Sequence, residues 1–278
     1  MSTMGATGLG RPIDLTNVSN RWAVGISVLA GLTQGALLLL GDGDGDLLLP
    51  AMVSISVFLA WAVARELDPD HPATAILAIA IAVPIILVTS GPTPAVAAAA
   101  LLGVRVMTGT VGRSLTLLDI AVMATAGIYS GIRVESWPIT ILIAVVLFLD
   151  GGDHSRAWAI LTVAGAALVA LVVANGPTPL LDISVVAQLV AIGLAMLLSI
   201  PVREVNSRSD SNGILLSARR ITLARASLGS ALAAGVILSG GNIGPIAPAL
   251  AALTAVALGR VAARRQTTSM SSSEPSPV

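Results

Sequence analysis

Cysteine and lysine are both absent from this chain of 278 residues. The absence of thiols excludes disulfides, thiolate catalysis and metal sites built on cysteine. Because lysine is absent, all fifteen basic side chains are arginine. This usage, together with the acidic stretch at residues 42–46, resembles that of salt-adapted prokaryotes with GC-rich genomes. The two histidines are too few to build a histidine-rich metal site, and a net charge of zero gives no reason to expect nucleic-acid binding.

Charged and aromatic residues are also scarce, at 11% and 3% of the chain. A soluble domain carries about 25% charged residues. Hydrophobic residues make up 55% of the sequence and occur in long runs, so the solvent of most of the chain is expected to be lipid. Nucleotide-binding and hydrolase signatures are missing from the sequence: it has no phosphate loop with lysine, no G-x-S-x-G and no H-E-x-x-H.

The apolar runs predict membrane-spanning helices, each of which needs about 20 residues. Ten segments approach or reach this length: residues 22–40, 47–64, 73–89, 93–112, 115–132, 136–149, 157–174, 180–200, 221–239 and 243–262. The sequence therefore predicts an all-α, polytopic membrane domain over residues 21–265. A flexible cytoplasmic tail is expected at residues 1–20 and a disordered cytoplasmic tail at residues 266–278.

The placement of arginine predicts how these spans are oriented. With ten spans and a cytoplasmic N-terminus, the cytoplasmic segments and adjoining helix ends hold every arginine except Arg133. Positive charge on short loops favours the cytoplasmic side. Both termini are therefore expected in the cytoplasm, with the protein in the plasma membrane.

A short motif is written twice, as SGPTP at residues 90–94 and NGPTP at residues 175–179. The pair Asp70-His71 precedes the first copy and the pair Asp153-His154 precedes the second at a similar distance. A near-constant offset indicates an internal repeat. An even number of spans per unit keeps the copies parallel, which predicts a 4+4+2 arrangement with units at about residues 22–112, 115–200 and, in part, 221–262.

The repeated motif itself is typical of a helix–turn–helix connection. Glycine followed by proline favours a sharp turn, threonine can cap the next helix, and proline suits the first helical position. The residues expected to act in this way are Gly91, Pro92, Thr93, Pro94, Gly176, Pro177, Thr178 and Pro179.

Two acidic loops are the strongest candidates for chemistry, and both are predicted on the cytoplasmic side. Their candidate metal ligands are Asp68, Asp70, His71, Asp150, Asp153 and His154. Paired carboxylates are suitable ligands for Mg²⁺, which could hold a diphosphate. The same residues could instead cap the helices that follow, with Arg65 and Arg156 neutralising the acids.

The position of these loops, after the second and sixth spans, is similar to that of the acidic motifs in intramembrane prenyltransferases. The loops here read E-L-D-P-D-H and D-G-G-D-H, whereas that family has spaced Asn and Asp residues and a D-x-x-x-D motif. The similarity implies an alternative function, a Mg²⁺-dependent membrane enzyme acting on a prenyl diphosphate.

Charges inside predicted spans are costly and call for an explanation. Arg105 lies in the fourth span and Asp119 in the fifth, so the two could form a salt bridge as the helices pack. Arg105 could also extend to the cytoplasmic surface. A relay for protons or ions between the two charges would instead indicate a transporter of ions or small solutes.

Together these patterns favour a protein that is not an enzyme: a permease-like or scaffold component of a membrane assembly. No cofactor is expected, and Mg²⁺ enters only under the enzyme alternative. The expected partners are the lipid bilayer and, through the arginine-rich loop at residues 203–225, other membrane or cytoplasmic proteins.

Overall fold

The computed structural model describes residues 9, 13–41, 46–89, 93–131, 136–149, 183–199, 202 and 204–271, with backbone only at residues 183 and 265–271. Within these residues the chain is helical and contains no strand, only an isolated antiparallel bridge between Arg208 and Leu215. The predicted all-α class is therefore confirmed for the described part of the chain.

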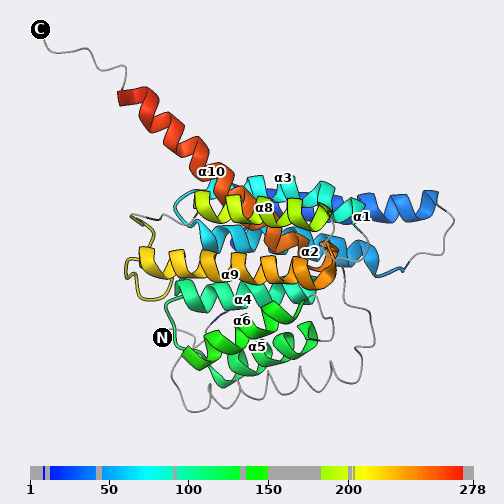
Figure 1. Ribbon diagram of the computed structural model, residues 1–278, viewed down its shortest axis with the longest axis horizontal. Coiled ribbons are helices and arrows are strands. Elements are labelled where there is room, and N and C mark those ends of the chain that lie inside the picture. Colours follow the sequence, from blue (N-terminus) through cyan, green and yellow to red (C-terminus); the bar gives the residue numbers. More distant parts are fainter. Residues whose placement is uncertain are drawn as a thin grey trace, which may run out of the picture.

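Figure 1 shows helices that run alongside one another in a single bundle. Their bounds are α1 Val18–Leu40, α2 Leu49–Leu67, α3 Pro72–Val88, α4 Pro94–Thr108, α5 Leu117–Ser130, α6 Trp137–Leu149, α8 Ile183–Ser199, α9 Ala218–Ser239 and α10 Ala247–Ser271, with a 3₁₀ turn, η2, at Gly244–Ile246 before α10.

Four helical segments are long and apolar enough to cross a membrane: α1, α2, α9 and the segment Gly244–Arg264. The other apolar helices, α3, α4, α5, α6 and α8, have 13 to 17 residues. A helix lies within nine of the ten predicted spans, and the remaining one, residues 157–174, lies outside the described residues. The count of ten spans and the internal repeat therefore stay predictions.

Local sequence explains where several helices begin and end. Thr116 caps α5 in a capping box, in which Asp119 reaches back to the amide of Thr116. Proline occupies the first position of α3 and of α4, where its missing N–H costs nothing. Gly109 ends α4 in the left-handed conformation, with φ at 70°.

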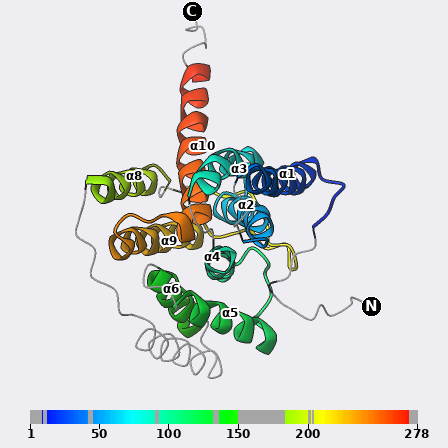
Figure 2. The same ribbon diagram turned by 90° about the vertical axis from the view of Figure 1, so that its right-hand side faces the viewer.

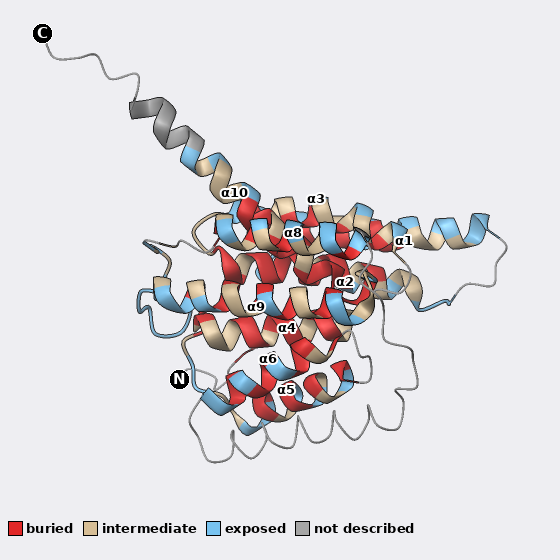
Figure 3. Ribbon diagram, viewed as in Figure 1, coloured by how far each residue is buried: buried red, intermediate tan, exposed pale blue. Residues whose placement is uncertain are grey.

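The core is formed where the central helices meet. α2 contacts α1, α3, α4 and α10, while α4 also contacts α5, α6 and α9. Figure 2 shows most of the helices foreshortened, with α10 running lengthwise across the view, and Figure 3 shows buried residues concentrated along the inward faces of the helices. Large apolar side chains on the outer face of α1 stay exposed, among them Trp22, Leu29 and Leu39, which suits a helix whose outer face meets lipid.

α10 has two parts with different surroundings. Its first half packs against α2, α3 and α8, and its second half extends beyond the bundle toward the C-terminus (Figures 1 and 2). Arg260, near the middle of α10, forms an ion pair with Asp68 at the end of α2.

Candidate functional site

The polar residues of the bundle gather at the end where α2, α4 and α8 finish and α3, α5 and α9 begin, which we call the Arg-rich end. The end of α2 carries two buried carboxylates, Glu66 in its last turn and Asp68 directly after its last residue, each with 1% of its side chain exposed. A charge buried this deeply is stable only when it is paired and hydrogen-bonded. Both carboxylates meet that condition.

Asp68 is the centre of the larger of the two clusters. Its Oδ1 accepts hydrogen bonds from Arg225 Nη2 at 3.1 Å and from Arg260 Nη2 at 3.0 Å. The hydroxyl of Thr74 donates to Oδ2 at 3.0 Å, and the Nδ1 atom of His71 lies 3.2 Å from Oδ1. One carboxylate thus joins four helices: α2, α3, α9 and α10.

Arg225 is fully buried and does more than pair with Asp68. Its Nε donates to the carbonyl of Leu67 at 2.8 Å, and its Nη1 donates to the carbonyl of Ser199 at 2.5 Å. These are the last residues of α2 and α8. The C-terminal carbonyls of a helix lack partners within it and favour a positive charge, so one guanidinium serves two helix ends.

Glu66 forms the second cluster. Arg105 Nε donates to Glu66 Oε1 at 2.8 Å, and the hydroxyl of Thr110 donates to Oε2. Glu66 is thus held by α4 and by the connection that follows it. The ion-pair partner of Arg105 is Glu66, rather than the predicted Asp119.

Arg105 and Asp119 are nevertheless linked, through the main chain of Leu9. Arg105 Nη1 donates to the carbonyl of Leu9 at 3.0 Å, and the amide of Leu9 donates to Asp119 Oδ1 at 3.3 Å. The other oxygen of Asp119 accepts from the amide and hydroxyl of Thr116, at 2.8 and 2.7 Å. The main chain of Leu9 therefore lies between the two charges that the sequence predicted to form a direct contact.

Asp70 has a different role from Asp68 and faces the segment between α8 and α9. Its carboxylate accepts from the amides of Asn206 and Ser207, at 3.0 and 2.8 Å, and from the Ser207 hydroxyl at 2.5 Å. Partial burial opposes ionisation of Asp70, but these hydrogen bonds and nearby His71 outweigh it and lower the pKa of Asp70 below its ordinary value of 3.8. The carboxylate anchors this segment.

The predicted capping roles are only partly seen. The N-cap position of α3 is His71, not Asp70, and its side chain makes no capping hydrogen bond. Thr93 does precede α4, but its hydroxyl makes no capping bond either; its carbonyl accepts from the amide of Val96 at 3.0 Å. Arg105 of α4, Arg225 of α9 and Arg260 of α10 pair with the buried acids. The Arg65 guanidinium donates to Asn20 Oδ1.

The remaining predicted site residues lie outside the described residues: Gly91, Pro92, Asp150, Asp153, His154, Gly176, Pro177, Thr178 and Pro179. Within the described part of the chain, no group of three or more His, Asp or Glu side chains is placed to hold a metal ion. Two of the predicted Mg²⁺ ligands, Asp68 and Asp70, accept the hydrogen bonds given above.

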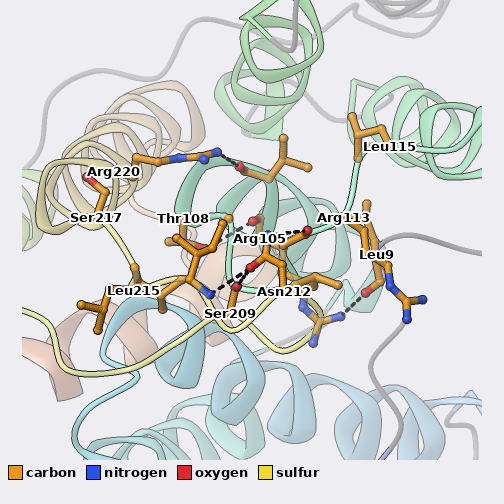
Figure 4. A pocket seen from close by; sticks show the side chains of 16 residues that line it. Leu9, Arg105, Thr108, Arg113, Leu115, Ser209, Asn212, Leu215, Ser217 and Arg220 are labelled. Atoms are coloured by element: carbon orange, nitrogen blue, oxygen red, sulfur yellow. Dashed lines mark hydrogen bonds between the residues drawn. The ribbon is translucent and has the colours of Figure 1, made fainter.

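A pocket of about 480 Å³ opens beside the second cluster. It lies among the end of α4, the connection to α5, residues 209–217 and the start of α9, and Figure 4 shows Arg105, Arg113 and Arg220 in its wall. Residues 209–217 are held against the α4–α5 connection by hydrogen bonds from the Asp210 amide to the Thr110 carbonyl, at 2.9 Å, and from Asn212 Nδ2 to the Gly112 carbonyl, at 3.0 Å.

Sequence reasoning missed the residues that organise this end of the bundle. The sequence pattern places Arg225 only in the arginine-rich loop at residues 203–225, and it gives Arg260 no role of its own. One signal was available: Arg225 lies inside an apolar helix, and an intramembrane charge predicts a buried partner. The identity of that partner, Asp68, 157 residues away in the sequence, had no signal.

Comparison with known proteins gives no relative: the chain matches no protein-family model, no curated protein and no solved structure.

Proposed function

We propose that this chain is a non-catalytic, multi-pass component of a membrane assembly, acting as a permease-like or scaffold subunit. The observation that supports the proposal is the use made of Asp68. Its carboxylate is buried and accepts hydrogen bonds from Arg225, Arg260 and Thr74. A carboxylate held in this way joins helices, whereas a Mg²⁺ site needs carboxylate oxygens free to coordinate the ion.

We further propose ten membrane spans in a 4+4+2 parallel repeat, with both termini on the cytoplasmic side of the plasma membrane. The ion pairs and hydrogen bonds of Arg105, Arg220, Arg225 and Arg260 join helix ends at the Arg-rich end. A concentration of arginine at one end of a bundle favours a cytoplasmic location for that end. The loop at residues 203–225 is the proposed contact with other proteins.

Binding of a divalent metal ion distinguishes the non-catalytic component from the enzyme alternative. We expect no saturable binding of Mg²⁺ or Mn²⁺ to the purified full-length chain in detergent, measured by isothermal titration calorimetry. The enzyme alternative instead requires Asp70 and Asp153 to supply ligands, so that an Asp70→Asn/Asp153→Asn variant would lose binding that the unchanged protein shows.

A matched control is the Asp14→Asn/Asp46→Asn variant, which removes the same number of carboxylates at exposed positions. Saturable binding that survives in this control and disappears in Asp70→Asn/Asp153→Asn would overturn the non-catalytic proposal. It would justify a screen of lipid diphosphates as substrates.

A transporter of ions or small solutes is the second candidate, and one observation favours it. Arg105, one of the two charges of the predicted relay, lies in the wall of the pocket at the Arg-rich end. Transport would require water to continue from this pocket along α4 into the bundle.

A further inference from the structure

We infer that the pocket at the Arg-rich end binds a phosphate-bearing group, presented by an anionic lipid headgroup or by free phosphate. The inference rests on the pocket alone and is independent of the non-catalytic role proposed above. Its volume of about 480 Å³ falls within the range of small-molecule sites.

The side chains that line the pocket carry positive charge. Arg105, Arg113 and Arg220 contribute to its wall, and the described lining includes no Asp or Glu. The charge of Arg105 is balanced by Glu66, which lies 2.8 Å from its Nε. Arg113 and Arg220 therefore supply the excess positive charge, and basic pockets between membrane helices favour anionic headgroups.

Both of these arginines have hydrogen-bond donors to spare. A guanidinium carries five N–H groups in a planar fork that fits phosphate oxygens. Arg220 uses Nε on the Met107 carbonyl at 2.7 Å and Nη2 on the Val106 carbonyl at 2.8 Å. Arg113 is exposed and makes no ion pair or hydrogen bond within the described part of the chain.

Arg220 is also held in position, which reduces the cost of binding. Its two bonds to the last turn of α4 fix the guanidinium at the pocket wall, where Figure 4 shows it on the side opposite Arg113. A pre-positioned cation loses less conformational freedom when a ligand arrives. The two arginines can therefore contact a headgroup from two sides.

Neutral donors complete the wall. Ser217 precedes α9 and its hydroxyl makes no capping hydrogen bond, so it stays available to a ligand at the positive end of the helix. Ile214 and Leu215 also line the pocket and are 63% and 54% exposed. An apolar rim beside a cationic wall suits a molecule that joins a phosphate to acyl chains.

The test uses the full-length protein in an uncharged detergent and three probes: dioctanoyl phosphatidic acid, inorganic phosphate and dioctanoylglycerol, which lacks phosphate. Isothermal titration calorimetry is expected to show saturable binding of at least one phosphate probe and none of dioctanoylglycerol. The Arg113→Gln and Arg220→Gln variants are each expected to weaken that binding about tenfold.

Arg219→Gln is the matched control, because Arg219 is exposed, adjacent to Arg220 and absent from the pocket wall. It makes the same change in net charge and is expected to bind as the unchanged protein does. If Arg220→Gln fails to fold, Arg113→Gln still carries the test, since Arg113 makes no ion pair or hydrogen bond within the described part of the chain.

Each outcome decides something. Binding of phosphatidic acid alone supports the site with a lipid as the source, and binding of inorganic phosphate with the same variant dependence supports it with a soluble source. The inference is overturned if neither phosphate probe binds saturably. It is also overturned if Arg219→Gln weakens binding as much as Arg113→Gln, because the effect would then come from general surface charge.

Discussion

Arg225 is a charged side chain with no exposed surface, placed where two helices end. Its guanidinium donates to the helix-terminal carbonyls of Leu67 and Ser199 and to the buried carboxylate of Asp68. An isolated buried charge would be strongly destabilising, and so would the unpaired partners that its removal leaves behind. The stability of the Arg-rich end therefore depends on this one residue more than on any exposed arginine of α9.

We expect Arg225→Met to lower the free energy of unfolding by about 3–5 kcal/mol, because two helix-terminal carbonyls lose their donor and Asp68 loses one of its two arginines. Denaturant unfolding in detergent, followed by circular dichroism, measures the change. Arg219→Met, at an exposed position of the same helix, is expected to stay within about 0.5 kcal/mol of the unchanged protein. Equal effects of the two substitutions would show that Arg225 has no special structural role.

Asp70 makes the docking of residues 204–217 depend on pH. Its pKa is lower in the folded protein than in the unfolded chain, since the hydrogen bonds from Ser207 and Asn206 favour the carboxylate despite partial burial. The stabilisation is therefore complete above the ordinary value of 3.8 and is lost as the pH falls through the folded pKa.

This effect can be measured by hydrogen exchange at the Asn206 and Ser207 amides. Asp70→Asn is expected to reduce protection relative to the unchanged protein at about pH 6, and the difference is expected to shrink as the pH is lowered toward about 2, because protonation removes the charge of Asp70. A difference of the same size at both pH values would mean that ionisation of Asp70 does not hold the segment.

At the scale of the helices, close packing depends on where small residues occur. Gly31 of α1 faces α2 so closely that an added Cβ would lie 2.6 Å from the carbonyl oxygen of Pro50 and would also meet the Ser54 hydroxyl. Gly25, less than two turns earlier in the same helix, has nothing within 4 Å of an added Cβ. Small residues let membrane helices approach closely, and only one of these two serves that purpose.

Gly31→Ala is therefore expected to lower stability by about 1–3 kcal/mol, because the backbone of α2 must move to admit the methyl group. Gly25→Ala is expected to be neutral or to raise stability by up to about 1 kcal/mol, since alanine favours a helix over glycine. Thermal unfolding of the two variants in the same detergent compares them directly. A loss in Gly25→Ala as large as that in Gly31→Ala would contradict the close approach of α1 and α2.

For the whole molecule, the absence of cysteine makes the proposed orientation simple to test. Single cysteines introduced by Ser211→Cys and Asn242→Cys would lie at exposed positions at opposite ends of the bundle. In intact cells we expect a membrane-impermeant maleimide to label Asn242→Cys at once and Ser211→Cys only after permeabilisation. The reverse pattern would place the Arg-rich end outside the cell, contrary to the proposal.

The same labelling distinguishes a scaffold from a transporter. Ala97 lies near the start of α4, away from the pocket at the Arg-rich end, and has 1% of its surface exposed. Ala97→Cys is expected to remain unlabelled in permeabilised cells under the scaffold proposal. Labelling would indicate a water path through the bundle and would favour the transporter.

Sequence reasoning was strongest where local composition decides the outcome. Apolar runs predicted the helices, and Pro94 marked the start of α4 because proline is tolerated at a first helical position. Prediction from the sequence was weaker for the acidic residues. Asp70 was expected to cap α3, but its carboxylate accepts hydrogen bonds from Ser207 and from Asn206, which is 136 positions away in the sequence. A local sequence pattern does not indicate which distant loop a residue will contact in the folded protein.

The sequence by itself therefore determined the helical class, the apolar character of the helices and the scarcity of charge within them, since each depends on residues that are neighbours along the chain. Only the tertiary structure decided that Glu66 pairs with Arg105, that Asp68 joins Arg225 and Arg260, and that Leu9 lies between Arg105 and Asp119. A buried charge accepts whichever partner the packing of the helices brings within hydrogen-bond distance, and that packing is settled by the bundle as a whole.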